Sequence, residues 1–201
     1  MALLIETPVT ATRTMVDFIS PEEYLVRERS LPKEDKHEFL NGKIIKMGGA
    51  REKHNKIAGN LQGELYIFLK GKDFRLYPSD MRVHNPLTSS YFYPDITVVK
   101  GQPLLKDKEF DNLLNPVLII EVLSKSTEAY DREDKFTACQ SILSLQEYVL
   151  VSSEGVQVEY FRKQNASQWE KQYFSDTADS LRLLDGEAVI RLADIYQGVN
   201  F

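Results

Sequence analysis

Two carboxylates and one lysine stand out in this sequence because each interrupts an apolar pattern. Glu121 lies inside the apolar run 117–123, which reads VLIIEVL, and Asp95 stands at the start of another apolar segment. Lys135 shares a helical face with the apolar residues at 138, 139 and 142. A carboxylate inside a buried strand is costly unless it is paired, hydrogen-bonded or bound to a cation.

Together, these three residues could carry out metal-assisted hydrolysis. Two carboxylates on neighbouring strands supply the oxygen ligands that a hard divalent cation prefers. A nearby lysine can orient or deprotonate a water, or neutralise the charge that develops on a phosphate. The combination is typical of metal-dependent cleavage of phosphodiester bonds.

Each of the three also has an ordinary structural interpretation. Glu121 could lie where its strand frays into solvent, and Asp95 could be a turn aspartate. Lys135 could extend past the edge of the core and pair with Asp131, four residues earlier on the same helix. The residues alone leave both interpretations open.

The N-terminal half of the chain predicts two helices separated by a hairpin. Ser20-Pro21-Glu22-Glu23 is typical of a capped helix start, and this helix should end near Pro32. Asn41-Gly42, between the segments 37–40 and 43–47, favours a type I′ hairpin turn. Apolar residues spaced by three and four predict an amphipathic helix over 52–70.

The remainder of the chain predicts strands around one further helix, at about 132–145. The expected strands are 74–77, 80–84, 93–99, 117–123, 147–153, 156–163, 168–174 and 188–190, and a helical turn is expected at 192–196. This order is not a regular βαβ alternation, so the predicted fold is a mixed α/β or α+β domain. We expect a flexible arm over residues 1–15 and a single domain over residues 16–201.

Length, cysteine content and apolar runs exclude several classes of protein. The 201 residues are enough to bury a core, and the single cysteine, Cys139, excludes an intramolecular disulfide framework and a Cys-rich zinc site. No apolar run approaches the ~18 residues of a membrane span. The N-terminus lacks the basic region of a signal peptide, so the expected compartment is the cytoplasm.

The charge of the chain limits how it could bind nucleic acid. A formal net charge of -5 argues against a protein that coats nucleic acid non-specifically, because such binding needs many basic residues. A local basic cluster could still receive DNA phosphates, and the expected members are Lys43, Lys46, Arg51, Lys53 and Lys56.

The chain resembles the Uma-two family of restriction-endonuclease-like proteins, which belongs to the PD-(D/E)XK nuclease superfamily. The resemblance covers about residues 20–195. It rests on the segments 93–95 (YPD), 116–124 (PVLIIEVLS), 126–135 (STEAYDREDK), 146–151 (QEYVLV) and 38–44 (EFLNGKI), and on His54. It implies a restriction-endonuclease-like core, in which helices flank a mixed central sheet.

The resemblance also implies an activity, a cofactor and a set of site residues. The activity is DNA cleavage that depends on Mg²⁺ or Mn²⁺. Asp95, Glu121 and the backbone carbonyl of Val122 would be the metal ligands. Glu38 would be an outer ligand or a general base, and His54 would position a water or a phosphate; either could instead be an ordinary polar residue.

The catalytic lysine departs from the superfamily pattern. That pattern would place a lysine at 123, where this chain has Leu123. The family resemblance implies Lys135, from the following helix, as the replacement. Lys125 is the competing candidate, because it shares the strand parity of Glu121. Asp80 is a further carboxylate expected near the same end of the sheet.

Other functions and an oligomeric state also follow from these features. Leu123 and the acidic net charge would suit a catalytically inactive module that binds nucleic acid or protein. A hydrolase acting on RNA or on a small phosphodiester is not distinguished from a DNA nuclease. Resemblance to nucleases of this architecture implies a C₂ homodimer, with strands 156–163 and 168–174 as the candidate interface.

Overall fold

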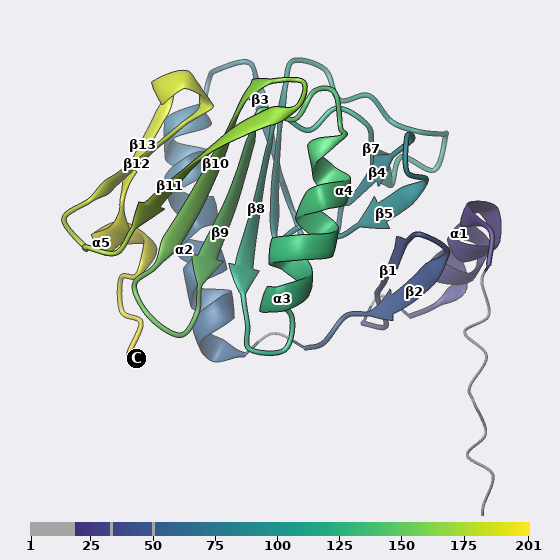
Figure 1. Cartoon of the computed structure of the whole chain (residues 1–201), viewed down its shortest axis with the longest axis horizontal. Helices are drawn as coiled ribbons and strands as arrows, with labels where there is room; N and C mark the ends of the chain where they lie inside the picture. Colours follow the sequence, from purple (N-terminus) through teal and green to yellow (C-terminus); the bar gives the residue numbers. More distant parts are fainter. Residues whose placement is uncertain (1–18, 33, 50) are drawn as a thin grey trace, which may run out of the picture.

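The computed structural model describes residues 19–32, 34–49 and 51–201, and the strands within these ranges form three sheets (Figure 1). The arm predicted over residues 1–15 lies outside the described residues. The division into an arm and a single domain therefore stays a prediction.

The largest sheet has six strands, in the order β11-β10-β9-β8-β6-β3. These strands are β3 (Phe74–Pro78), β6 (Ile96–Lys100), β8 (Leu118–Leu123), β9 (Glu147–Ser152), β10 (Val158–Asn165) and β11 (Gln168–Phe174). The pair β8–β9 is parallel, whereas the other neighbours in this sheet are antiparallel. All six residues of β8 are buried, which confirms the predicted central strand.

Helices cover both faces of this sheet (Figure 1). Helix α2 (Glu52–Leu69) packs on one face, where Ile120 of β8 joins its buried residues in one apolar core. The other face carries α3 (Glu128–Tyr130), a π-helical segment (Asp131–Lys135) and α4 (Phe136–Gln140). Alternate residues of β8 therefore enter two different cores, as expected for a strand covered on both sides.

The second sheet has the order β2-β1-β5-β4-β7. Its strands are β1 (His37–Leu40), β2 (Lys43–Lys46), β4 (Arg82–Asn85), β5 (Ser90–Phe92) and β7 (Asn112–Leu113). Asn41 and Gly42 both have positive φ, 52° and 80°, as a type I′ turn requires, so the predicted hairpin is confirmed. Helix α1 (Pro21–Ser30) packs against this sheet, and its Tyr24 stacks on Phe39 at a ring separation of 5.1 Å.

The C-terminal part adds the two-stranded sheet β12–β13 (Ser180–Leu183 and Ala188–Arg191) and the short helix α5 (Leu192–Ile195). The element η2 (Leu184–Gly186), a 3₁₀ turn, connects the two strands. Leu181, Leu192 and Ile195 extend the apolar core beneath α2.

Several predicted boundaries were wrong. The helix expected over 132–145 begins at Glu128 and ends at Gln140, because the amides of Thr127 and Glu128 bond the Ser124 carbonyl and start the turn earlier. The strand expected over 93–99 begins only at Ile96. The short strands β5, β7 and β12 were not predicted.

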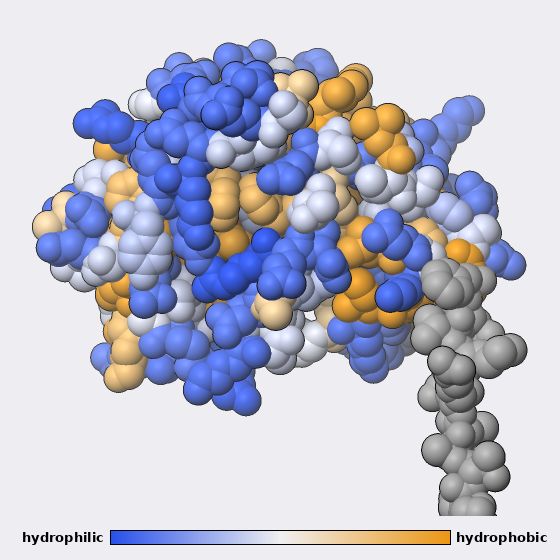
Figure 2. Space-filling view, in the orientation of Figure 1, coloured by the Kyte–Doolittle hydropathy of each residue, from blue (hydrophilic) through white to orange (hydrophobic). Residues whose placement is uncertain are grey.

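The visible surface is mostly hydrophilic. Figure 2 shows hydrophobic side chains gathered mainly in the right half of the view, around β4, β5 and β7. Among the described residues, no helix combines the length and apolar character needed to cross a membrane.

Candidate active site

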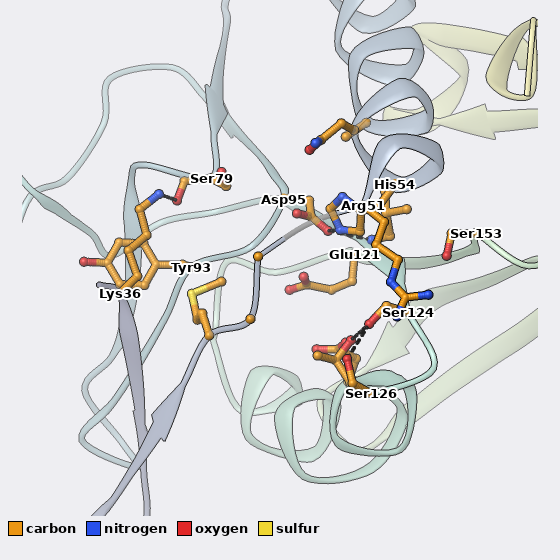
Figure 3. Close-up of a pocket in the computed structure, with 18 of the residues that line it drawn as sticks. Lys36, Arg51, His54, Ser79, Tyr93, Asp95, Glu121, Ser124, Ser126 and Ser153 are labelled. Carbon is orange, nitrogen blue, oxygen red and sulfur yellow. Dashed lines mark hydrogen bonds and ion pairs between the residues drawn. The ribbon is translucent and has the colours of Figure 1, made fainter. Parts of the chain in front are cut away.

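A cavity of about 910 Å³ lies where β8 ends and β6 begins. Its walls come from the hairpin β1–β2, the start of α2, the loop after β8 and the segment that follows it (Figure 3). The cavity brings together the predicted catalytic and metal-binding residues, namely Glu38, His54, Asp95, Glu121, Val122 and Lys135.

Lys135 occupies the centre of the buried charges. Its Nζ atom lies 2.8 Å from Oε1 of Glu38, 2.7 Å from Oε1 of Glu121 and 3.7 Å from Oδ1 of Asp131. The Glu38 contact is a hydrogen bond, whereas the Glu121 contact is an ion pair without hydrogen-bond geometry. The side chains of Lys135, Glu38 and Glu121 are at most 5% exposed, so these charges interact with little screening by water.

Glu38 connects the second sheet to the start of β6. Its Oε1 atom accepts the backbone N–H of Tyr93 at 2.8 Å, in addition to the Lys135 ammonium. The Tyr93 hydroxyl in turn donates to Glu28 of α1 at 3.1 Å. Two separate parts of the chain therefore hold Glu38 directly, and Glu28 of α1 contributes only through Tyr93.

Asp95 is fixed by the backbone of the neighbouring strand. Its Oδ2 atom accepts the N–H of Val122 at 2.7 Å and lies 3.1 Å from Nε2 of His54. The Val122 amide is available because the pairing of β6 with β8 stops at Ile96 and Ile120. In an extended strand the N–H and C=O of one residue point to the same side, so the Val122 carbonyl also faces this end of the site.

The pKa values of these groups reflect burial and crowding of negative charge. Burial raises the pKa of Glu121 well above its usual value; Lys135 opposes this rise, and the other carboxylates add to it. Burial would lower the pKa of Lys135, but the surrounding carboxylates raise it well above normal. For His54, the hydrogen bond and charge of Asp95 outweigh burial and raise the pKa.

The carboxylates that line the cavity are groups that could hold a hard divalent cation. Three carboxylates lie within 3.7 Å of the single buried ammonium, namely those of Glu38, Glu121 and Asp131, and the charge of Asp95 acts on Glu121. Over the residues that the structure covers, no three His, Cys, Asp or Glu side chains are grouped as a metal site. Mg²⁺ is commonly held by only one or two carboxylates plus waters, so two carboxylates and a backbone carbonyl suit it.

Asp131 is a site residue that the sequence analysis interpreted only as an ordinary ion-pair partner. Its side chain is buried and lines the cavity, and its backbone carbonyl accepts the Tyr148 hydroxyl at 3.1 Å. Burial raises the pKa of Asp131, and Lys135 opposes that rise. It begins the π-helical segment that Lys135 ends, a type of segment frequently found at functional sites.

Two of the expected residues lie away from the buried cluster. Lys125 is 78% exposed and pairs with Glu154 at 3.3 Å, on the rim of the cavity. Asp80 is 81% exposed and pairs with Lys36. Asp80 does follow the end of β3 that pairs with the start of β6, as expected, but its side chain does not line the cavity.

The predicted basic cluster is divided by the structure. Lys46, Arg51 and Lys53 line the cavity, whereas Lys43 and Lys56 do not. Lys46 pairs with an aspartate at 3.3 Å and Lys56 with a glutamate at 3.7 Å, so part of the basic charge is neutralised within the chain.

Comparisons with known proteins agree with this fold. Residues 21–193 match a family model described as "Uma2: Putative restriction endonuclease". Two proteins of Synechocystis are similar in sequence. "Uncharacterized protein sll1609" is 36% identical over 75% of this chain and 84% of its own length, and "Uncharacterized protein slr1290" is 34% identical over 91% and 94%.

A solved structure shares the fold. It is the crystal structure of "a putative nuclease belonging to DUF820" from Anabaena variabilis, which matches with a TM-score of 0.74 and 19% identity. The match covers 90% of this chain and 99% of the other. The predicted mixed α/β, nuclease-like fold is thereby confirmed.

Proposed function

The chain belongs to the Uma2 family of restriction-endonuclease-like proteins, and we propose that it hydrolyses DNA phosphodiester bonds with the aid of Mg²⁺ or Mn²⁺. The observation that carries this proposal is the convergence of Glu121, Asp95 and Lys135 in one cavity, where carboxylates outnumber cations. Such an excess of buried negative charge favours binding of a cation.

The proposed metal ligands are Asp95, Glu121 and the carbonyl of Val122. A divalent cation bound there would supply positive charge to the phosphate and acidify an attacking water. Asp95 is already oriented for this role by the Val122 amide, and Glu121 by the Lys135 ammonium. Ligands held in place by neighbouring groups need little rearrangement on binding.

The remaining side chains have supporting roles in this proposal. Lys135 orients Glu121 and offsets negative charge that develops on the phosphate. Glu38 holds Lys135 in place through its 2.8 Å hydrogen bond. His54 positions a water or a phosphate oxygen from the wall of the cavity, where its Nε2 atom lies 3.1 Å from Asp95.

The direct test is cleavage of supercoiled plasmid DNA with Mg²⁺ or Mn²⁺. The isosteric variants Asp95→Asn and Glu121→Gln should lose cleavage, whereas Asp73→Asn, a control at an exposed carboxylate far from the cavity, should retain it. Equal nicking by the wild type and both site variants would indicate a contaminating nuclease and remove the proposal.

The alternative is a nuclease fold retained as a binding module. The observation that favours it is Leu123, which occupies the lysine position of the superfamily pattern and is 3% exposed within an apolar core. A folded wild type that binds oligonucleotides but cleaves neither DNA, RNA nor a small phosphodiester with either metal would support this alternative.

We also propose that the protein acts as a homodimer, because two DNA strands require two sites. Strand β11 is an edge of the six-stranded sheet and carries the exposed Tyr173, which suits an interface. A light-scattering mass near the 23.1 kDa of one chain would refute the dimer. The cytoplasm stays the compartment predicted from the sequence.

A further inference from the structure

Arg51 is a cation on the rim of the cavity that has no acidic partner within the described part of the chain. It stands directly before α2, its side chain is exposed, and it caps no helix amide. Figure 3 shows the side chain extending from the start of α2 toward Ser124. A guanidinium placed in this way is free to bind an anion that enters the cavity.

The loop opposite Arg51 is lined by hydroxyl groups. The Oγ atom of Ser124 lies 3.0 Å from Oγ of Ser126 and 3.1 Å from Oγ1 of Thr127, and all three residues line the cavity. Ser126 is exposed, at the outer end of this chain of hydrogen bonds. Serine and threonine hydroxyls commonly donate hydrogen bonds to phosphate oxygens.

Two of the acidic residues that line the cavity with Arg51 are paired with other cations. Glu154 on the opposite rim pairs with Lys125 at 3.3 Å, and Glu52 pairs with Lys56 at 3.7 Å. Arg51 therefore keeps a positive charge that these carboxylates do not neutralise. The net effect is a small region that attracts anions, beside a buried cluster that attracts cations.

This region adjoins the buried carboxylates at Thr127, whose side chain hydrogen-bonds Asp131, and extends outward from there to the exposed Ser126 and Arg51. Ser124 directly follows β8 and lies three residues beyond Glu121, which corresponds to at most about 10 Å of backbone. Successive phosphates of a nucleotide chain could therefore contact the carboxylate end and the loop end of the cavity.

We infer that Arg51 and the hydroxyl loop 124–127 form a subsite for a nucleic-acid backbone phosphate next to the one that is cleaved. The inference rests on the proposed function, because it assigns a phosphate chain as the substrate. The planar guanidinium matches two phosphate oxygens, and the hydroxyls donate to the others. Arg51 acts in binding, so its loss should raise KM and leave kcat unchanged.

The test measures binding of a labelled oligodeoxynucleotide in EDTA, by fluorescence anisotropy over a range of salt concentrations. Arg51→Gln should raise Kd about tenfold and reduce the log–log salt slope by about 1. The control Lys70→Gln removes the same charge from an exposed residue directly after α2 and should change neither. A fully methylphosphonate-substituted oligonucleotide should bind the wild type and Arg51→Gln equally, because it lacks the phosphate charge.

A second pair of variants examines the loop. Ser126→Asp introduces a negative charge into the subsite and should weaken binding more than Thr137→Asp, which changes an exposed hydroxyl residue of α4 outside the cavity. Equal affinities and salt slopes for Arg51→Gln and Lys70→Gln would overturn the subsite, even if the wild type cleaves DNA. Conversely, Arg51-dependent binding without any metal-dependent cleavage would support the subsite and reject the proposed hydrolysis.

Discussion

The ammonium of Lys135 lies 2.7 Å from the Glu121 carboxylate, although one residue belongs to a helical segment and the other to the central strand. Both side chains are almost completely buried. A buried ion pair is stable only when further contacts compensate for lost hydration, and Glu38 provides one at 2.8 Å. This pair therefore connects the stability of the fold to the chemistry of the cavity.

Removing the lysine should strongly destabilise the protein. Lys135→Met leaves Glu38 and Glu121 buried without their cation, and breaking a buried pair costs on the order of 3–5 kcal/mol of unfolding free energy. Urea denaturation measures this loss. The double variant Lys135→Met/Glu121→Gln should recover part of the lost unfolding free energy. Exposed ion pairs contribute up to about 1 kcal/mol, so a loss below that value in Lys135→Met would contradict the role of the pair.

Glu38 should matter for rate more than for metal affinity. Glu38→Gln keeps an oxygen for the Tyr93 amide but weakens the hydrogen bond that holds Lys135. Loss of such a supporting contact is expected to lower the cleavage rate about 10–100-fold. The measurements are kcat for cleavage and Kd for Mn²⁺, each compared between Glu38→Gln and the wild type. If the affinity for Mn²⁺ falls by as large a factor as kcat, Glu38 is a metal ligand instead.

His84 should make the protein sensitive to mild acid. Its Nδ1 lies 3.0 Å from the Ser90 carbonyl and its ring stacks on Tyr91. Burial lowers the pKa of His84, with a smaller contribution from the charge of Lys106. The folded state then disfavours protonation, so its stability should be lost as the pH falls below the ordinary histidine value of about 6.5.

The variant His84→Phe keeps the ring stack but cannot titrate. Loss of the Ser90 hydrogen bond should lower the unfolding free energy of the variant by an amount that does not depend on pH. Apart from this loss, the stability of the variant relative to the wild type should improve as the pH is lowered. Chemical denaturation at several pH values measures the difference. Parallel pH profiles for the two proteins would show that His84 contributes no acid sensitivity.

Helix α1 should depend on its capping box. The Ser20 hydroxyl accepts the Glu23 amide at 3.1 Å, and the Glu23 carboxylate accepts the Ser20 amide at 2.7 Å. Ser20→Ala should reduce the unfolding free energy by about 1 kcal/mol, whereas Ser20→Asp, which can also cap, should lose much less. Equal denaturation midpoints for the wild type and Ser20→Ala would contradict the capping role.

Local sequence signals predicted the elements that have strong patterns of their own. The Asn41-Gly42 turn, the capped helix α1, the amphipathic helix α2 and the buried strand β8 all lie close to their expected positions. The strands β5 and β7 have only three and two residues, too few to show a period, and pairing with distant segments forms them.

In the candidate site too, the sequence predicted the residues that interrupt a local pattern but not the contacts that depend on distant segments. Glu121 was identified because it is a carboxylate in an apolar strand, and the structure buries it beside Lys135. The contacts of Asp95 with the Val122 amide and of Glu38 with the Tyr93 amide use backbone groups that become available only where strand pairing ends. No local pattern encodes those positions, and none distinguishes a π-helical turn at Asp131 from an α-helical one.

The central claim is that Asp95 and Glu121 hold a divalent cation, and calorimetric titration of the 201-residue chain with Mn²⁺ tests it most directly. The wild type should bind Mn²⁺ at millimolar concentrations or below. Asp95→Asn and Glu121→Gln should weaken binding about tenfold or more, while the exposed control Asp73→Asn should not. A folded wild type that binds no Mn²⁺ at millimolar concentrations, or site variants that bind it as well as the wild type, would contradict the claim.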